Sequence, residues 1–287
     1  MGPYALVERL GAVSALDRVA GPLSAAAKRL IGRGVLKDLL SGTPLGHPLH
    51  PVLSDVPIGA FASAAVLDLL ATGDGNEPAA SVLIAAGVLS AVPTAAAGYA
   101  DWSETYGEDQ RIGLVHALLN AGAVGLYAGS LLARLRGDRR AGTVLALSGL
   151  AVVSASSYLG GHLSFGHGVG VNNAFFQRGP DDWTEVLPVD DLEAGTPRRV
   201  DAGDATVLLV RRDNEILAIG SRCTHAGGPL EEGTVDPRHG TVECPWHQSV
   251  FRLDDGSVVH GPASAPERAY DVRVRNGAIE LRRRATA

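Results

Sequence analysis

Two short motifs in the C-terminal third of the chain each combine one cysteine with one histidine. They read Cys223-Thr-His225 and Cys244-Pro-Trp-His247, and they contain the only two cysteines of the 287 residues. The 18 residues between them, 226–243, are enough for a strand, a turn and a strand that would set the two motifs side by side. Two thiolates and two imidazoles gathered in this way form a metal-binding set.

The segment that carries these motifs has the pattern of an antiparallel β domain. From Trp183 onward, short alternating runs such as ATVLLVRR, EILAIG and SVFRLD are separated by Gly, Asp, Asn and Pro turns. Such spacing predicts a small barrel or sandwich. Asp213-Asn214 and Asp254-Asp255-Gly256 fit hairpin turns. We therefore expect both motifs on loops at the tips of neighbouring strand pairs.

Residues 183–284 resemble a Rieske ferredoxin domain. The resemblance rests on CTHAGGPL in the first ligand loop, CPWHQSVF in the second, and Gly261-Pro262 in a third loop that covers the cluster in that family. It implies a [2Fe-2S] cluster in which two cysteines hold the buried iron and two histidines hold the outer iron through nitrogen. These ligands are Cys223, Cys244, His225 and His247. Gln248 departs from the family, which commonly has glycine there.

Zinc is the alternative that this donor set leaves open, because two Cys and two His also make a tetrahedral zinc site. Zinc fingers usually pair cysteine with cysteine and histidine with histidine, whereas each loop here supplies one cysteine and one histidine. In a cluster, imidazole ligands raise the potential to about −150 to +300 mV across the class. The loops lack the extra cysteines that form a disulfide in respiratory Rieske proteins. This favours a reducing compartment and the lower part of that range.

The middle of the chain contains uncharged apolar runs long enough to cross a membrane. They cover residues 79–100, 112–133 (with His116 as the ionisable group) and 141–161, and a shorter run at 56–71 is interrupted by Asp68. Four transmembrane helices are therefore expected. The alternative is a soluble four-helix bundle, whose helices should show polar faces that these runs lack.

Three parts follow from these patterns: a helical segment over 1–46, a four-helix transmembrane domain over 47–175 and a Rieske [2Fe-2S] domain over 176–287. The predicted fold class is thus multidomain, an all-α transmembrane bundle followed by an all-β barrel or sandwich. The first segment is amphipathic and basic, which fits a helix on the membrane surface or one packed against the soluble domain.

The net charge of −6 lies in the C-terminal part. Residues 1–180 carry 12 Asp+Glu and 12 Lys+Arg, whereas residues 181–287 carry 19 Asp+Glu and 13 Arg. An acidic soluble domain argues against a nucleic-acid partner and favours a basic or polar protein surface.

Several histidines lie near the ends of the predicted spans. Antiparallel spans with short connections would bring together His47, His50, Asp101, Trp102, His116, His162 and His167 at one membrane face. They could ligate haem b or another metal, or relay protons to a quinone, and the first ligand candidates are His50, His116 and His162. The structural alternative is that they cap helices and bond to carbonyls. GHPLHPVLSDVPIGAF and GGHLSFGHGVGV resemble an uncharacterised bacterial family of four-helix membrane domains, over roughly residues 4–175, which implies no activity.

The predicted function is that of a membrane-anchored carrier of single electrons, rather than a substrate-converting enzyme, between a cytoplasmic donor and a membrane or soluble acceptor. The expected partners are a reductase or oxidase protein, the membrane and a quinone. A redox sensor and a ferredoxin component of an oxygenase system are the alternatives. An oxygenase itself would need an iron site of two histidines and one carboxylate, which the residues around the cluster do not form.

The expected location is the inner membrane of a bacterium with the cluster domain in the cytoplasm. Export of a basic N-terminal segment and a folded domain would require a targeting signal, which the sequence does not show. The positive-inside rule argues for the opposite orientation, through four arginines of the loop on the far side: Arg134, Arg136, Arg139 and Arg140.

Overall fold

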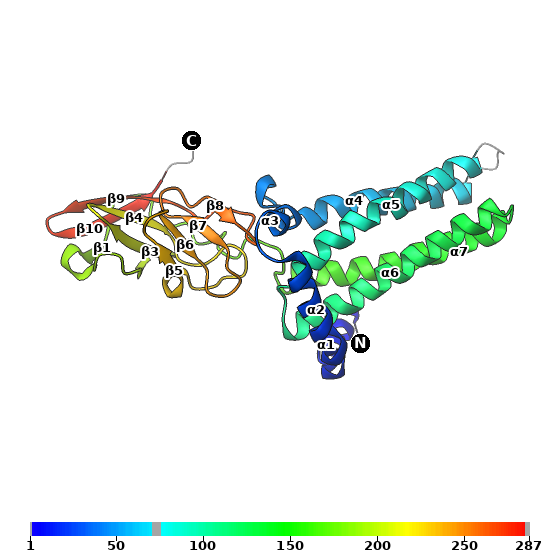
Figure 1. The fold of residues 1–287 in the computed structure, drawn as a ribbon, viewed down its shortest axis with the longest axis horizontal. Helices are drawn as coiled ribbons and strands as arrows, with labels where there is room; N and C mark the ends of the chain where they lie inside the picture. Colours follow the sequence, from blue (N-terminus) through cyan, green and yellow to red (C-terminus); the bar gives the residue numbers. More distant parts are fainter. Residues whose placement is uncertain (1, 71–75, 285–287) are drawn as a thin grey trace. The chain divides into compact units, whose positions relative to one another are not determined.

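The computed structural model describes residues 2–70 and 76–284, which form two compact units (Figure 1). One unit is helical and comprises Met1–Gly32 and Leu49–Val169. The other is mostly β-structure and comprises Arg33–Pro48 and Gly170–Ala287. The N-terminal segment that the sequence suggests as one piece is thus divided between the two units.

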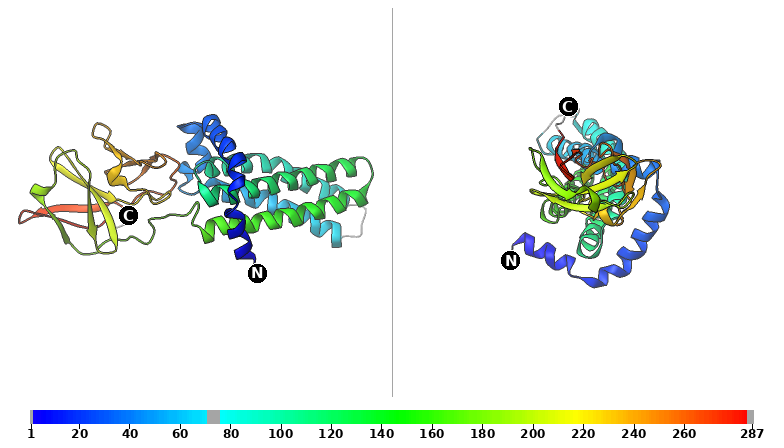
Figure 2. Two further views of the ribbon diagram at one scale, coloured as in Figure 1. Left: turned by 90° about the horizontal axis from the view of Figure 1, so that it is seen from below. Right: turned by 90° about the vertical axis from the view of Figure 1, so that its left-hand side faces the viewer.

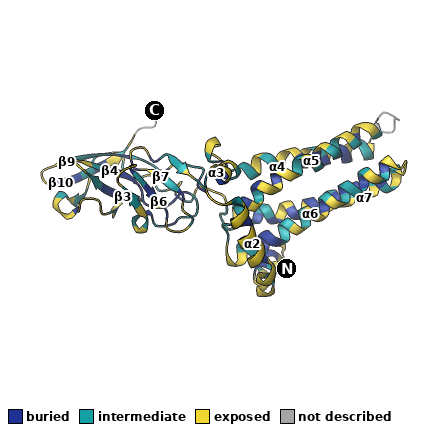
Figure 3. Ribbon diagram, viewed as in Figure 1, coloured by how far each residue is buried: buried dark blue, intermediate teal, exposed yellow. Residues whose placement is uncertain are grey.

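Four long helices make up the core of the helical unit: α4 (Leu49–Leu70), α5 (Asn76–Trp102), α6 (Gly107–Leu135) and α7 (Arg139–Gly161). All four are long and apolar enough to cross a membrane, which confirms the predicted spans. The shorter apolar run that Asp68 interrupts lies in α4, which begins at Leu49 and continues past Asp68. Figure 3 shows exposed residues along these helices, and many are apolar, as outer faces against lipid require.

Small residues let the four helices approach closely. Phe61 of α4 stacks on Tyr127 of α6 with ring centroids 3.6 Å apart. Glycines stand opposite both rings, since a Cβ atom on Gly87 would lie 2.4 Å from the Phe61 ring and one on Gly149 would lie 2.9 Å from Tyr127. Close packing through glycine replaces the hydrophobic drive that lipid does not supply between helices.

A buried ion pair explains how α4 accommodates its acidic residue. Asp68 pairs with Arg134 of α6, and the two side chains are only 1% and 3% exposed. Arg134 also donates from Nε to Ser130 Oγ. Arg134 was grouped from the sequence with the arginines of a loop, but its charge is turned into the bundle and neutralised there.

The first two helices, α1 (Pro3–Gly11) and α2 (Asp17–Ile31), run across the bundle (Figure 2). Val7 of α1 packs with Ile112 and Leu159, while Ala20 of α2 packs with Trp102 and Leu114. Arg111 fixes the start of α2 through two hydrogen bonds to the Asp17 carboxylate, of 2.7 and 2.8 Å. One face of this helical pair is therefore buried on the bundle, and its other face is exposed.

Within the described residues, the β unit has ten strands in three antiparallel sheets, which confirms the predicted all-β class. The first sheet has the order β1 (Thr184–Pro188), β10 (Ala278–Arg283), β9 (Tyr270–Arg275). The second has β2 (Arg198–Ala202), β3 (Ala205–Arg212), β4 (Glu215–Gly220). The third has β5 (Thr234–Asp236), β6 (Thr241–Glu243), β7 (Val250–Arg252), β8 (Val258–His260).

Strand β3 connects the two cores of the β unit. Its side chains alternate, so that Val207 and Leu209 enter one core and Leu208 and Val210 enter the other. The second core contains both cysteines. The predicted two-residue turn at Asp213-Asn214 joins β3 to β4, with Arg212 paired to Glu215. A short helix, α3 (Val35–Ser41), and the 3-10 turn Thr43–Leu45 belong to this unit as well.

Candidate metal centre

The two ligand loops have the same backbone pattern. The first follows β4, and in it the Cys223 N–H donates to Gly228 O at 2.8 Å while the Gly227 N–H donates to Cys223 O at 2.7 Å. The second joins β6 to β7, and there the Cys244 N–H donates to Ser249 O at 2.8 Å while the Gln248 N–H donates to Cys244 O at 3.0 Å. Each loop thus folds back on its own cysteine, which points inward.

The two cysteine sulfur atoms are buried, whereas the two imidazole rings are half-buried. Cys223 and Cys244 are each 1% exposed and belong to the apolar core. The hydrogen bond between them raises the pKa of Cys223 well above its ordinary value and lowers the pKa of Cys244 to about 7. The half-buried rings of His225 and His247 lie 4.8 Å apart between centroids and are nearly perpendicular, at 85°.

This arrangement fits a [2Fe-2S] group with one thiolate-held and one imidazole-held iron. The cradle is tight, because a Cβ atom on Gly228 would lie 2.9 Å from Cys244 Sγ and 3.1 Å from the Trp246 ring. A bound metal would keep both thiols ionised. The four residues of the predicted ligand set therefore lie together, and their role as ligands stays a prediction.

Gln248 occupies a left-handed backbone conformation. Its φ is +64°, and the matching position in the first loop, Gly227, has φ +78°. The departure from the family pattern therefore leaves the loop shape intact, and the glutamine side chain carries the strain that glycine avoids. Left-handed geometry costs about 1–2 kcal/mol for a residue with a Cβ atom.

Replacement of Gln248 by glycine is expected to stabilise the β unit slightly. Relief of about 1–2 kcal/mol of strain is partly offset by about 0.5–1 kcal/mol of added freedom in the unfolded chain. Gln248→Val should destabilise the unit, because a β-branched residue tolerates positive φ poorly. Thermal unfolding at constant iron content measures both effects. A glycine variant less stable than the valine variant would contradict the assignment of strain.

Residues that follow β7 in the chain form hydrogen bonds to the ligand loops. The Ala263 N–H donates to the buried hydroxyl of Ser249 at 2.9 Å. Thr224 donates twice, from Oγ1 to Ala265 O at 2.7 Å and from its backbone N–H to Glu267 Oε1 at 2.7 Å. Burial raises the pKa of Glu267 well above its ordinary value. The sequence did not point to Glu267, because a lone glutamate in a loop reads as a surface residue.

Two segments far from the motifs in the sequence also bond to the ligand loops. Asn173 donates from its backbone N–H to Thr224 O at 3.0 Å and from Nδ2 to His225 O at 2.9 Å. In α3, the Asp38 carboxylate accepts the Gly261 N–H at 2.8 Å and lies 2.9 Å from His260 Nδ1. The stretches that flank the helical unit in the chain thus form hydrogen bonds to the first ligand loop, through Asn173, and to the third loop, through Asp38.

The three haem candidates of the helical unit separate into two places. His50 and His116 lie together, with ring centroids 6.4 Å apart and planes at 86°. Each donates from Nδ1 to a backbone carbonyl, His50 to Thr94 O at 2.9 Å and His116 to Ser156 O at 2.8 Å. His162 belongs to a second group, described next. His47 is exposed in the β unit.

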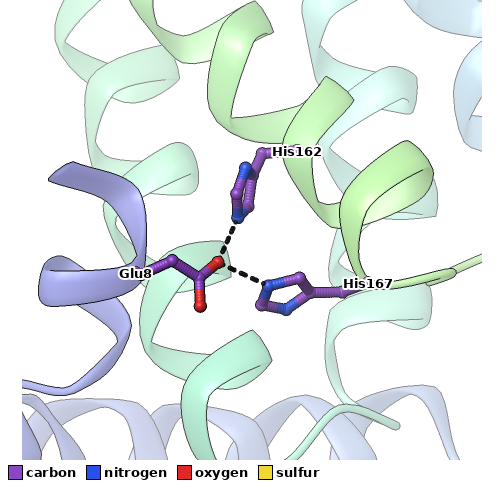
Figure 4. A group of neighbouring side chains, drawn as sticks. All are labelled: Glu8, His162 and His167. Carbon is purple, nitrogen blue, oxygen red and sulfur yellow. Dashed lines mark hydrogen bonds and ion pairs between the residues drawn. The ribbon is translucent and has the colours of Figure 1, made fainter. Parts of the chain in front are cut away.

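Glu8, His162 and His167 form this second group (Figure 4). Glu8 Oε1 lies 2.8 Å from His162 Nε2 and 3.0 Å from His167 Nε2, and Asp109 Oδ1 lies 2.5 Å from His167 Nδ1. Hydrogen bonds to Asp109 and Glu8 raise the pKa of His167, and those from His167 and His162 lower the pKa of Glu8. Glu8 was not a sequence candidate, because 154 positions separate it from His162.

An antiparallel β domain with two Cys-His loops around one centre defines a Rieske-type iron-sulfur protein. The chain belongs to this family: residues 182–275 match the model described as "Rieske [2Fe-2S] domain". Residues 46–173 match a second model, "Predicted membrane protein (DUF2231)". Both resemblances found in the sequence are therefore confirmed, and with them a [2Fe-2S] cofactor and a membrane protein.

Several relatives are ferredoxins. Ferredoxin CarAc of Metapseudomonas resinovorans is 32% identical over 98 residues, 34% of this chain and 90% of that protein. The 3-phenylpropionate/cinnamic acid dioxygenase ferredoxin subunit of Escherichia coli (strain K12) is 35% identical over 94 residues, 33% of this chain and 87% of that protein. These matches support an electron-transfer role for the Rieske domain.

Other matches cover less or are weaker. Apoptosis-inducing factor 3 of Mus musculus is 34% identical over 105 residues, 36% of this chain, and the match spans only 17% of that protein's length. Among solved structures, the ferredoxin of carbazole 1,9a-dioxygenase from Nocardioides aromaticivorans IC177 is 30% identical, covers 36% of this chain and 98% of its own, and has a TM-score of 0.34.

Proposed function

We propose that the chain passes single electrons, through its [2Fe-2S] cluster, from a cytoplasmic donor protein to a membrane or soluble acceptor in the inner membrane of a bacterium. The observation that carries the proposal is the division of the ligands: thiols in the core and imidazole rings at the loop tips. When bound, the cluster supplies one-electron chemistry at moderate potential. No substrate cavity is needed for such a role.

The residues around the imidazoles suit the docking of a redox partner. Trp246 is 54% exposed and its ring lies 6.5 Å from that of His247, between centroids. Exposed tryptophan is a common anchor at protein interfaces. The acidic character of the unit would steer a partner with a basic surface toward it.

The proposal is tested by the spectrum of the purified full chain. Reduction with dithionite should produce a Rieske-type EPR signal, with two irons and two acid-labile sulfides per chain. The physical reason is that each loop offers one thiolate and one imidazole, which together satisfy two irons. A protein that contains zinc and no iron would refute the proposal, because the same four donors would then serve a structural zinc ion.

A ferredoxin component of an oxygenase system is the second candidate. The observation that favours it is the match, over most of their length, with relatives named as ferredoxin and dioxygenase ferredoxin subunit. In this case the acceptor would be a separate oxygenase protein. Rapid oxidation of the reduced chain by such an oxygenase, but not by membrane quinones, would distinguish this candidate.

A redox sensor is the third candidate, and the contacts of Asn173 and Asp38 favour it. Both residues belong to stretches that flank the helical unit in the chain, and they bond to the first ligand loop and to the third loop. A change in cluster charge could thus bias those stretches. A sensor would show a different protease sensitivity near Asp38 in the oxidised and reduced states, whereas a simple carrier would not.

The proposal extends to haem b between His50 and His116. The two imidazoles, with ring centroids 6.4 Å apart, are the residues that would hold the haem iron. Both Nδ1 atoms donate to carbonyls, which leaves Nε2 as the metal-binding nitrogen. Asn120 Nδ2, now 3.1 Å from His116 Nε2, would have to turn aside. A quinone that accepts protons beside these histidines remains the other use of the pair.

Haem at this place predicts a Soret band in membranes from haem-sufficient cells. His50→Ala and His116→Ala should each abolish the band, because a four-helix bundle holds such a group through both axial ligands. His239→Ala, an exposed histidine of the β unit, is the matched control. A wild-type protein without the band would exclude haem at this pair.

A further inference from the structure

We propose that Glu8, His162 and His167 bind one divalent first-row transition metal ion, at a site separate from the cluster. Glu8 lies in α1, and the two histidines lie in and just after the π-helical turn that follows α7, all within the helical unit. Their donor atoms lie within 4.8 Å of one another. The proposal is independent of the electron-carrier function and of haem.

Both histidines direct the same ring nitrogen at one carboxylate oxygen. Glu8 Oε1 lies 2.8 Å from His162 Nε2 and 3.0 Å from His167 Nε2 (Figure 4). In a tetrahedral site with bonds of about 2.0–2.2 Å, donor atoms stand about 3.4 Å apart. The two separations from Glu8 would therefore lengthen by about half an ångström, while the widest separation among the three donors, which lies within 4.8 Å, would shorten toward the same value. Glu8, whose side chain is 37% exposed, can supply part of that movement.

Asp109 gives the group a second feature of metal sites. Its Oδ1 lies 2.5 Å from His167 Nδ1, the nitrogen that faces away from Glu8. Histidines that bind metals commonly donate their other N–H to a carboxylate, which fixes the tautomer and makes the ligating nitrogen more basic. Asp109 would therefore act as a positioning residue for His167 and not as a ligand.

The backbone is shaped to bring the two histidines together. Residues five apart on a regular α-helix point about 140° away from each other. Here the turn His162–Gly166 is π-helical, and the His167 N–H donates to His162 O at 3.2 Å. The ring centroids consequently lie only 4.8 Å apart. Such π-turns are frequent at functional sites.

The donor set defines the class of ion. Two imidazoles and one carboxylate suit Zn²⁺ or Fe²⁺ and leave at least one coordination position for water or another ligand. The competing interpretation is an ion-pair triad in which a protonated His167 lies between Asp109 and Glu8 and no metal binds. The two interpretations predict different results in a zinc titration: a metal site binds one Zn²⁺ with release of the proton from His167, whereas a triad held together only by its ion pairs takes up no stoichiometric zinc.

The test is Zn²⁺ uptake by the purified full chain in detergent after a chelator wash, with zinc and iron measured in the same sample. We expect one zinc per chain at undiminished cluster iron. His162→Ala and His167→Ala should weaken zinc binding at least hundredfold, and Asp109→Asn about ten- to hundredfold. His239→Ala is the matched control, because it removes an exposed histidine that lies 2.7 Å from a single carboxylate, that of Asp236.

Three outcomes would overturn the proposal. The first is a wild-type protein that takes up no zinc. The second is zinc uptake that is equal in wild type and the site variants. The third is zinc that enters only as cluster iron is lost, since the cluster ligands would then be binding it. Should an alanine variant fail to fold, Glu8→Gln decides, because it keeps the size and hydrogen bonding of a partly exposed side chain while removing its charge.

Discussion

Cys223→Ser is expected to abolish the [2Fe-2S] cluster, with at least a tenfold loss of iron and sulfide per chain and no EPR signal after reduction. The serine hydroxyl is a poor iron ligand beside a thiolate, and ferric iron with sulfide prefers sulfur donors. Cys223 is 1% exposed within the core, so no solvent ligand can easily take its place. Iron analysis and EPR of the purified full chain measure the loss.

The variant needs a control that separates cluster loss from misfolding. His239→Ala leaves both ligand loops untouched and should keep full iron content, and the helical unit should show unchanged helicity in both variants. Retention of two irons by Cys223→Ser would mean that Cys223 is not a ligand. His247→Ala should also lose the cluster, which distinguishes the Rieske set from a centre held by sulfur alone.

The cluster loops could be predicted because their information is local. Each motif sets its two ligands within four residues, and the strands beside them carry the period-two alternation of a half-buried sheet. The helices of the membrane domain were equally visible as uncharged runs. Gln248 could be recognised from the sequence only as a departure from the family's glycine. Its φ of +64° shows that the loop keeps the backbone conformation of a glycine at that position.

Contacts between distant residues could not be predicted. Helix topology did not place His47, which belongs to the β unit. It also could not separate the pair His50 and His116 from His162, since that depends on the rotation of each helix. Glu8 meets His162 across 154 positions and Asp109 meets His167 across 58. No periodicity connects residues so far apart.

The amphipathic N-terminal segment was ambiguous for a different reason. A stripe of apolar residues among basic ones has the same period whether it meets lipid or protein. The structure buries Val7 and Ala20 on the helical unit and fastens Asp38 to the third loop of the β unit. Exposed apolar residues such as Leu6 and Leu30 remain on the other face. Contact with the membrane surface stays a prediction for that face.

Removal of one member of the Asp68–Arg134 pair is expected to destabilise the helical unit by about 3–5 kcal/mol, because the remaining charge stays buried without its counter-charge. Arg134→Met and Asp68→Leu should each show this loss, and a charge inside a membrane bundle makes it severe. The double variant should recover most of it, since two apolar side chains of similar volume need no solvation. Unfolding of the purified protein in detergent measures all three.

Arg136→Met is the matched control, because Arg136 is exposed near the same helix end and its removal should change stability by less than about 0.5 kcal/mol. If the double variant is as unstable as the single variants, the ion pair adds net stability to the folded protein, and the prediction is wrong.

The expected recovery follows from where the two charges lie. Asp68 places a negative charge in an apolar span, and Arg134 neutralises that charge. The pair then fixes the alignment of α4 against α6, the same two helices that carry His50 and His116. Loss of that alignment should loosen the histidine pair as well.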